Sequence, residues 1–593
     1  MSLTIEQAFS EFQQARLEFV QEASKFVRDP VNLEAFKAAQ SVQLLKPLIS
    51  DPVPTIRVSA SSILTQLTDM SEDVANAVVE INMIPLFVSR LSEGTVANRK
   101  SAVNALNSIV RHSPELANSV FDCDALPALV ALLQDEDASL REASLNMLES
   151  FASHNAELAT HVTDEAALPH IVTCLSAPEL NVKRAATAAV TQIAKHTADL
   201  AQLVSDANGI VPLVRSLSHS DTTLKEHATE CLANISRHSI DLAEQVDEAQ
   251  ILPAIVFCLR DLNPVVRKNA ATCIREISKH SLELSKKIVD CGGLPGIVTF
   301  VNDTVGLDCI SGIMTLGYIA AYSETLAWLV LSSKAVLPLL HALVAEPEES
   351  VKSAAAWTLG QIGRHSTEHA RQVASEDLCL VKLVAVMMHE QASDDLFDKC
   401  QTALKGIISK CIFFPALEPL LMADDTPMEV VRYVVEQYAK KLPNEKQTVD
   451  RIRAQLEREK DRQREMEAQE REGSATKKGK KQAQSASQSR AGERSASASP
   501  SSMKSSSASH DLSSISLAQY QTETRRFLQC GGLQRVQYLK TLVEPSSKLA
   551  LAVDKILTCF PEEIVRQTHP DYEKEILKKV EQFKGDVEEE NSR

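Results

Sequence analysis

A short pattern that recurs at a constant spacing limits the possible fold of this chain more than any other feature. The pattern is a histidine followed by a polar residue, a variable residue, an acidic residue and leucine. Its complete copies begin at His112, His154, His196, His238 and His280, and consecutive copies start 42 residues apart. Tyr322 takes the histidine position in the next copy, and His365 follows 43 residues later. A fixed period of roughly 40 residues is the signature of a helical solenoid.

A second marker repeats with nearly the same spacing and stays in phase with the first. It is a proline that follows each copy, at Pro85, Pro127, Pro169, Pro212, Pro253, Pro295 and Pro338. Two independent markers in phase over so long a stretch indicate that one structural unit is repeated.

The unit around His280 shows which helices each repeat contains. Apolar residues lie at helical spacing from Val265 to Ser278, which predicts a long helix with one buried face. This helix is expected to end at Lys279-His280, where positive charge is favourable. A short helix should then run from Ser281 through Val289.

The end of the unit predicts a third helix. The sequence Asp290-Cys-Gly-Gly should stop the short helix, because glycine tolerates a left-handed C-terminal turn. Leu294-Pro295 should open the next helix, where the missing proline N–H costs little. Three helices per unit are typical of an armadillo repeat. We therefore predict an all-α, right-handed superhelical solenoid of armadillo repeats.

The pattern also predicts the organisation of the whole chain. We expect an N-terminal capping helix at 1–28, armadillo repeats at 29–443, a charged helix with a serine-rich disordered insert at 444–518, a final repeat with a C-terminal cap at 519–583, and an acidic tail at 584–593. The capping helix carries Phe9, Phe12, Leu17 and Phe19 among polar residues, and a solenoid end must cover its apolar face.

The repeat resumes after the insert. Phe527-Leu-Gln-Cys-Gly-Gly-Leu533 restates Val289-Asp-Cys-Gly-Gly-Leu294. The insert should therefore lie at a surface junction between two helices, where long insertions cost little loop entropy. It is rich in charge and serine and should bury little apolar surface.

Composition and missing motifs exclude several classes of function. A net charge of -17 argues against a general nucleic-acid binder, which presents a basic face. The sequence lacks His-Glu-x-x-His, G-x-G-x-x-G and G-x-S-x-G, so we expect no enzyme, no cofactor and no catalytic metal.

The scattered cysteines, without a C-x-x-C pair, predict buried free thiols in a reducing compartment. The longest apolar run, 326–344, contains Lys334 and Pro338 and is expected to be repeat core, not a membrane span.

Five basic residues occupy equivalent repeat positions and are the candidate partner-binding residues. They are Arg111, Lys195, Arg237, Lys279 and Arg364, each directly before the repeat histidine or its equivalent. Stacked repeats should align them along one ridge beside the concave surface, where they could bind an acidic partner. The alternative is a structural role, in which the cations favour helix termination and the imidazoles form hydrogen bonds within the fold.

Four stretches carry a resemblance to a known family. They are GIMTLGYIAA at 312–321, AAAWTLGQIGRH at 354–365, PALEP at 415–419 and CFPEEIVR at 559–566. With the repeats, they resemble the armadillo proteins of the flagellar central pair, the family of sperm-associated antigen six and its algal and protist counterparts. The resemblance covers residues 1–443 and 519–583, and the insert departs from the family pattern.

The resemblance implies a structural scaffold of the axonemal central apparatus, on the C1 microtubule side, needed for ciliary and flagellar motility. The implied partners are other central-apparatus proteins and microtubules, reached directly or through other proteins, with self-association also open. The implied location is the cytoplasm and cytoskeleton, in the axoneme of a cilium or flagellum. No nucleic acid or membrane is expected as a partner.

The alternative function is an armadillo adaptor for protein transport or signalling, similar to importin-alpha. Such adaptors hold basic peptides with tryptophan and asparagine repeated on the long helices. Here Trp357 stands alone, and the equivalent positions hold Asn104, Ala188, Glu230 and Thr272. An N-terminal basic arm is not apparent either.

Overall fold

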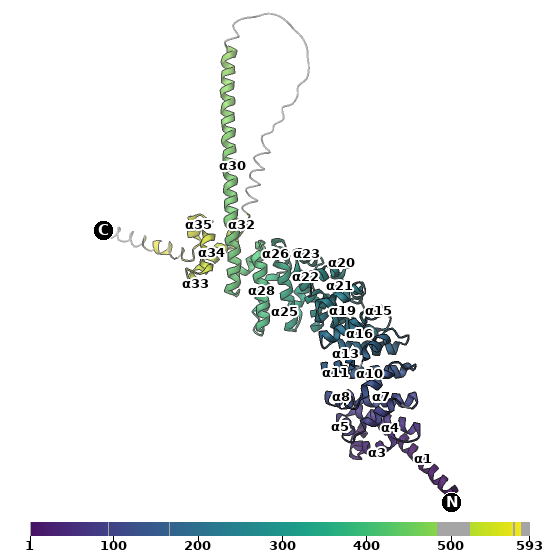
Figure 1. The fold of residues 1–593 in the computed structure, drawn as a ribbon. Coiled ribbons are helices and arrows are strands. Elements are labelled where there is room, and N and C mark those ends of the chain that lie inside the picture. The colour runs from purple at the N-terminus through teal and green to yellow at the C-terminus, as the bar shows by residue number, and fades with distance from the viewer. Residues whose placement is uncertain are drawn as a thin grey trace, which may run out of the picture. The chain divides into compact units, whose positions relative to one another are not determined.

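The computed structural model describes residues 2–482 except 93 and 165, and residues 522–582 except 573, 575 and 581. Every regular element in these ranges is a helix, which confirms the prediction of an all-helical armadillo-type repeat fold (Figure 1). The chain divides into two compact units. The first comprises residues 1–342 and 346–358, and the second comprises residues 343–345 and 359–593.

In the first unit, α1 (Ser2–Phe26) and a 3-10 turn at Pro30–Asn32 precede regular triplets of helices. The first helices of the triplets are α2 (Leu33–Ala38), α5 (Glu72–Glu80), α8 (Pro114–Phe121), α11 (Ala156–Asp164), α14 (Ala198–Asp206), α17 (Ile240–Glu248), α20 (Leu282–Asp290) and α23 (Glu324–Ser332). The second helices are α3 (Ser41–Ile49), α6 (Ile84–Leu91), α9 (Ala125–Leu132), α12 (Ala167–Cys174), α15 (Ile210–Ser216), α18 (Ile251–Cys258), α21 (Gly293–Asp303) and α24 (Val336–Ala345). The long third helices are α4 (Pro54–Met70), α7 (Val96–Val110), α10 (Ala138–His154), α13 (Leu180–Ala194), α16 (Thr222–His238), α19 (Pro264–Ser278), α22 (Ile310–Tyr322) and α25 (Glu349–Gly363).

Side-chain caps explain why the first helix of most triplets begins where it does. The residue after the repeat histidine, or after Tyr322, accepts a hydrogen bond from the leucine N–H three positions later. These caps are Ser113, Asn155, Thr197, Ser239, Ser281 and Ser323. Each cap satisfies a backbone donor that the helix itself leaves free.

A left-handed residue before the second helix also recurs every 42 residues. The positions are Gln40, Asn82, Asp124, Ala166, Asn208, Gln250, Gly292 and Lys334. Glycine is the residue that adopts this conformation without strain, yet only Gly292 is one. Asn82, Asp124 and Asn208 are of residue types that also adopt this conformation readily, whereas Gln40, Ala166, Gln250 and Lys334 are not. The chain therefore turns in the same way in each repeat, although half of these positions give no sequence signal for the turn.

Successive long helices pack on each other and form the core of the first unit. In α19, the four apolar residues that predicted this face are fully buried: Val266, Ala270, Ile274 and Ile277. Small and medium aliphatic side chains allow the helix backbones to approach closely.

Ion pairs tie neighbouring repeats together near the start of the long helices. Arg99 pairs with Asp135 at 2.6 Å, and Arg141 pairs with Glu179 at 3.0 Å. The same arrangement recurs in Arg184–Asp221, Lys225–Asp261 and Lys268–Asp308. Because donor and acceptor lie 36 residues apart in the Arg99 pair, the contact joins one repeat to the next.

The N-terminal helix covers the array only with its C-terminal part. Val20, Ala23 and Val27 are buried, and α1 packs against α4. Phe9, Phe12 and Phe19, expected to be covered by the first repeat, are 60%, 57% and 47% exposed. The prediction that this helix hides its apolar face is therefore wrong for these three phenylalanines, and no repeat lies beneath the first half of the helix (Figure 1).

The second unit contains the remaining helices and the return of the chain after the insert. They are α26 (Thr367–Ser375), α27 (Cys379–Met387), α28 (Asp394–Lys410), α29 (Phe414–Met422), α30 (Met428–Gln482), α32 (Thr522–Gln529), α33 (Gly532–Leu542), α34 (Lys548–Leu557) and α35 (Glu562–Gln567). Helix α30 runs without a break from the repeat core into the charged segment, and Figure 1 shows it extending past its neighbours. The expected domain boundary at 443–444 thus falls inside a helix, and Val449 beyond it is 6% exposed.

Aromatic side chains join the segments before and after the insert. The Phe414 and Tyr438 rings stack with centroids 4.3 Å apart, and Tyr438 lies 4.7 Å from Phe527. The Phe527 and Phe560 rings are 6.1 Å apart. Since these rings come from α29, α30, α32 and the turn after α34, the chain completes one core on both sides of the insert.

Candidate functional site

The five basic positions lie at the C-terminal ends of long helices. Arg111, Lys195 and Lys279 are the C-cap residues of α7, α13 and α19, and Arg237 lies in the last turn of α16. Arg364 follows the end of α25 and belongs to the second unit. The predicted location at helix ends therefore holds for each residue, and the first four share one unit.

The repeat histidines, four of which directly follow one of these cations, form a ladder of contacts between repeats. In each case Nε2 lies near the backbone oxygen of the residue 44 positions earlier, at 2.6 to 2.9 Å. The pairs are His112–Thr68, His154–Val110, His196–Ala152, His238–Ala194 and His280–Ser236. A carbonyl oxygen only accepts, so each Nε2 carries the proton. We call this set the histidine ladder.

The ladder refines the structural alternative for the histidines. The expected hydrogen bond within the fold reaches the end of the preceding long helix rather than the next turn. It supplies a donor to a carbonyl at a helix end, where the helix itself provides none; the Thr68 carbonyl also accepts from the Ser71 N–H at 3.2 Å. Burial lowers the pKa of His196 and of His280, which favours the neutral ring in both.

Three of the cations make a second, parallel set of contacts. Lys195 Nζ donates to the Ser153 carbonyl at 3.0 Å, and an Arg237 guanidinium nitrogen donates to the Lys195 carbonyl at 2.7 Å. Lys279 Nζ donates to the Arg237 carbonyl at 2.9 Å. The series continues with the Tyr322 hydroxyl, 2.6 Å from the Lys279 carbonyl. Tyr322, which occupies the histidine position, thus binds the carbonyl one residue after the one that a ladder histidine would reach.

Acidic side chains surround the same cations. Burial raises the pKa of Glu149, while the positive charges of Arg111 and Lys195 oppose this rise. Burial would also raise the pKa of Glu276, but hydrogen bonds from Lys279 and Arg275 outweigh it and lower the pKa. Acidic groups near Arg111, Lys195 and Lys279 therefore offset part of the positive charge at these positions.

Trp357, the single tryptophan at the position where adaptors repeat theirs, makes an internal contact. Trp357 and Tyr318 meet edge to face with ring centroids 5.4 Å apart. A Cβ placed on Gly317 would lie 2.1 Å from Trp357 Cζ3, so the indole packs directly on this glycine. The tryptophan fills a space between α22 and α25, which sequence reasoning about a tryptophan–asparagine series did not anticipate.

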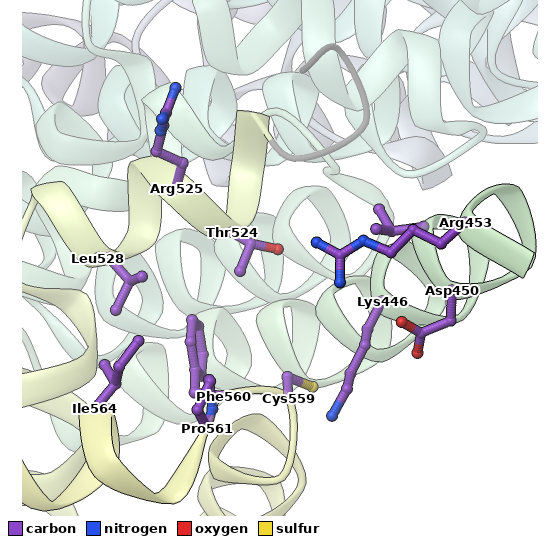
Figure 2. A pocket seen from close by; sticks show the side chains of 11 residues that line it. Lys446, Asp450, Arg453, Thr524, Arg525, Leu528, Cys559, Phe560, Pro561 and Ile564 are labelled. Carbon is purple, nitrogen blue, oxygen red and sulfur yellow. The ribbon is translucent and has the colours of Figure 1, made fainter. Parts of the chain in front are cut away.

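A pocket lies where the chain returns after the insert. It has a volume of about 450 Å3 and is lined by residues of α30, α32, α35 and the turn before α35. Figure 2 shows Leu528, Phe560, Pro561 and Ile564 on one side of it, and Lys446 and Arg453 on the other. Lys446 Nζ donates to the Thr558 carbonyl at 2.8 Å, so it also holds the two segments together. Sequence reasoning missed this pocket, because its walls come from segments more than 70 residues apart.

Within residues 2–482 and 522–582, no three His, Cys, Asp or Glu side chains are placed to hold a metal ion. Eight of the twelve cysteines are buried and all are unpaired. Burial raises the pKa of Cys231 to about 12, so this thiol stays protonated and unreactive.

In the described part of the chain, no one helix combines the length and apolar composition of a membrane span. Two bent helix pairs, α5 with α6 and α23 with α24, reach that length and composition only when the two helices are taken together.

Comparisons with known proteins agree with the repeat assignment. The armadillo/beta-catenin-like repeat family matches residues 197–237, and the HEAT repeat family matches residues 251–281. An engineered protein of known structure superimposes with a TM-score of 0.60, over 66% of this chain and 97% of its own length. The two are 21% identical, so this likeness concerns the fold alone.

Two natural relatives resemble the chain in sequence. Sperm-associated antigen 6 of Homo sapiens is 36% identical over 238 residues, and the Mus musculus protein shows the same identity over the same length. The match covers 40% of this chain and 31% of each relative's length. The chain is thus an armadillo-repeat protein, and over that stretch it resembles sperm-associated antigen 6.

Proposed function

We propose that the chain is a structural scaffold of the axonemal central pair, on the C1 microtubule side, and that cilia or flagella need it for motility. The resemblance to sperm-associated antigen 6 over 238 residues carries this proposal. The fold supports it, since a stack of repeats with side-chain contacts across each junction gives a stiff body with an extended surface for proteins.

The proposed function involves no enzymatic reaction. The residues that recur in this chain either join one repeat to the next, as the histidine ladder and the ion pairs do, or cap its helices. We therefore assign the chain a binding and positioning role, without cofactor or catalytic metal. Its partners would be central-apparatus proteins and microtubules, in the cytoskeleton of the axoneme.

Cells that lack the protein test this proposal most directly. They should remain viable, with weakly beating or paralysed flagella and a central pair that lacks density on the C1 side in electron tomograms. A tagged copy should restore both and locate to the axoneme. Normal motility after complete loss, together with a defect in nuclear import, would instead support the adaptor function.

We further propose that the five basic positions contact an acidic surface of the partner. Reversal of all five to glutamate should weaken incorporation into the axoneme, since attraction beyond about 8–10 Å is screened in cellular salt and contact must be local. The control reverses five exposed cations elsewhere: Arg260, Lys286, Lys334, Lys405 and Lys410. Both variants change the net charge equally.

Thermal melting must accompany this experiment, because Lys195, Arg237 and Lys279 also donate to carbonyls of the preceding repeat. The partner-binding role predicts that incorporation falls at temperatures where the variant remains folded. A lower melting temperature with normal incorporation would leave these residues with a structural role alone.

A further inference from the structure

The first half of α1 presents an apolar stripe to solvent. Ile5, Phe9 and Phe12 follow the 4-3 spacing of a helix face and are 70%, 60% and 57% exposed. The same stripe continues into Val20 and Ala23, which are buried against the first repeat. The stripe therefore begins beyond the end of the array and is covered only where a repeat lies beneath it. Clustered exposed aromatic residues of this kind mark an interaction site.

The charge on α1 before residue 16 is negative. Glu6 and Glu11 flank the stripe, and residues 2–15 contain no lysine or arginine. Arg16, the next residue on the same face, lies over the Phe12 ring with its guanidinium carbon 4.6 Å from the ring centroid, and it pairs with Asp51. Glu11 accepts only a long contact of 3.4 Å from Gln7, and both side chains are exposed. A surface that covers the stripe must therefore combine an apolar floor with a cationic rim.

The pocket beside α30 has this combination. Its apolar part consists of Val449, Leu528, Phe560, Pro561 and Ile564. Its rim carries Lys446, Arg453 and Arg525 against a single acid, Asp450. Arg453 and Arg525 are exposed, and Figure 2 shows the Arg453 guanidinium reaching toward Thr524 across the pocket.

We propose that the first half of α1 from one copy of the chain docks in this pocket of a second copy. Phe9 and Phe12 would enter the apolar part, while Glu6 and Glu11 face Arg453 and Arg525. The two surfaces are different, so the contact is heterologous and leaves one free surface of each kind. Copies would therefore associate head to tail rather than about a two-fold axis. The inference concerns the isolated protein and does not depend on the axonemal function.

Sedimentation of the full chain over a wide range of concentration tests the proposal. The wild-type protein should form a series of species that grows with concentration. Phe9→Ser with Phe12→Ser should weaken association by about a hundredfold, because an aromatic anchor in an interface pocket commonly contributes about tenfold or more. Arg453→Glu with Arg525→Glu should weaken it as well, and adding Glu6→Arg with Glu11→Arg should restore it.

Two controls separate the contact from general effects. Phe257→Ser and Leu262→Ser replace side chains that are 75% and 97% exposed elsewhere, and they should leave association unchanged. Equal melting temperatures for all variants would show that each still folds. Mixing the Phe9/Phe12 variant with the Arg453/Arg525 variant should give a pair that does not extend, since each variant retains one intact surface.

Three results would overturn the proposal. The first is a wild-type chain that stays monomeric at every concentration. The second is association that persists in the Arg453/Arg525 variant, which would show α1 pairing with α1 or with another surface. The third is docking of α1 in the pocket that is independent of concentration, which would show that the pocket is filled by α1 of the same chain. None of these would bear on the axonemal location, which motility and tomography measure separately.

Discussion

The Nε2 atom of His196 lies 2.6 Å from the carbonyl oxygen of Ala152, which stands 44 residues earlier at the end of the preceding long helix. The same relationship recurs along the histidine ladder. Each imidazole thus satisfies a helix-end carbonyl of another repeat, which makes the end of one helix dependent on the presence of the next.

Replacing His196 by alanine should therefore destabilise two repeats together. The carbonyl of Ala152 would lose its partner, at a cost of about 1–3 kcal/mol. Native-state hydrogen exchange should accelerate at the C-terminal turn of α10 as well as in α13. His389→Ala, at an exposed position outside the ladder, should change stability by no more than about 0.5 kcal/mol. Equal effects of the two substitutions would argue against the ladder as a stabilising device.

The ion pair between Arg184 and Asp221 predicts a dependence on pH. The hydrogen bond from Arg184 lowers the pKa of Asp221 to about 2, below its usual value near 3.9. A depressed carboxyl pKa contributes stability that is present above about pH 4 and is lost as the pH falls toward 2. Asp221→Asn should therefore lower the melting temperature at neutral pH and have a smaller effect near pH 2.

Asp137→Asn provides the matched control for this experiment. Both aspartates cap a long helix by accepting a leucine N–H three residues later, and asparagine preserves this contact. Asp221 also pairs with an arginine of the preceding repeat, at a site where its own side chain is 14% exposed. Asp137→Asn should thus lower the melting temperature less, and the reverse order would contradict the role assigned to the pair.

Gly317 should tolerate no larger side chain. Its Cβ would lie 2.1 Å from Trp357 Cζ3, and such overpacking commonly costs about 1–3 kcal/mol. Gly406 offers a contrast in another long helix, because the nearest atom to its Cβ lies 3.5 Å away. Gly406→Ala should be neutral or stabilising, since alanine is favoured in helices by about 1 kcal/mol. Chemical denaturation of both variants measures the difference.

Two deletions test where the packed part of α30 ends. Removing 457–516 should leave the melting temperature unchanged, because it preserves Lys446 and Val449. Removing 446–516 should lower it, since Val449 is 6% exposed and burial of such a side chain is worth about 1.5–3 kcal/mol. The same melting temperature for both deletions would mean that the first turns after residue 445 add nothing to the core.

The repeat period and the helix order could be predicted from the sequence, because each depends on local patterns that recur. The helix expected from Val265 to Ser278 is α19, Pro264–Ser278. The continuity of α30 could not be predicted, because a charged segment without an apolar stripe gives no sign of where it joins a core. The left-handed turns at Ala166 and Lys334 carry no glycine and are imposed by packing of the repeats.

The candidate sites were predicted less completely. The equivalent placement of the basic positions at helix ends follows from the period, but their carbonyl partners lie in another repeat and leave no local signal. The pocket beside α30 depends on contacts such as that between Glu445 and Thr524, 79 residues apart. The exposure of Phe9 and Phe12 depends on how far α1 extends beyond the first repeat, which amphipathic spacing alone does not determine.

The constant offset of the histidine ladder has a consequence for how such a chain can change in length. Duplication or loss of one whole 42-residue unit would leave each remaining imidazole opposite an equivalent carbonyl, as the equal 44-residue offsets of His112 and His280 illustrate. Insertion of a single residue within a long helix would instead rotate every later side chain of that helix by about 100°. Gain and loss of material should therefore be tolerated in whole units or at the junctions between helices.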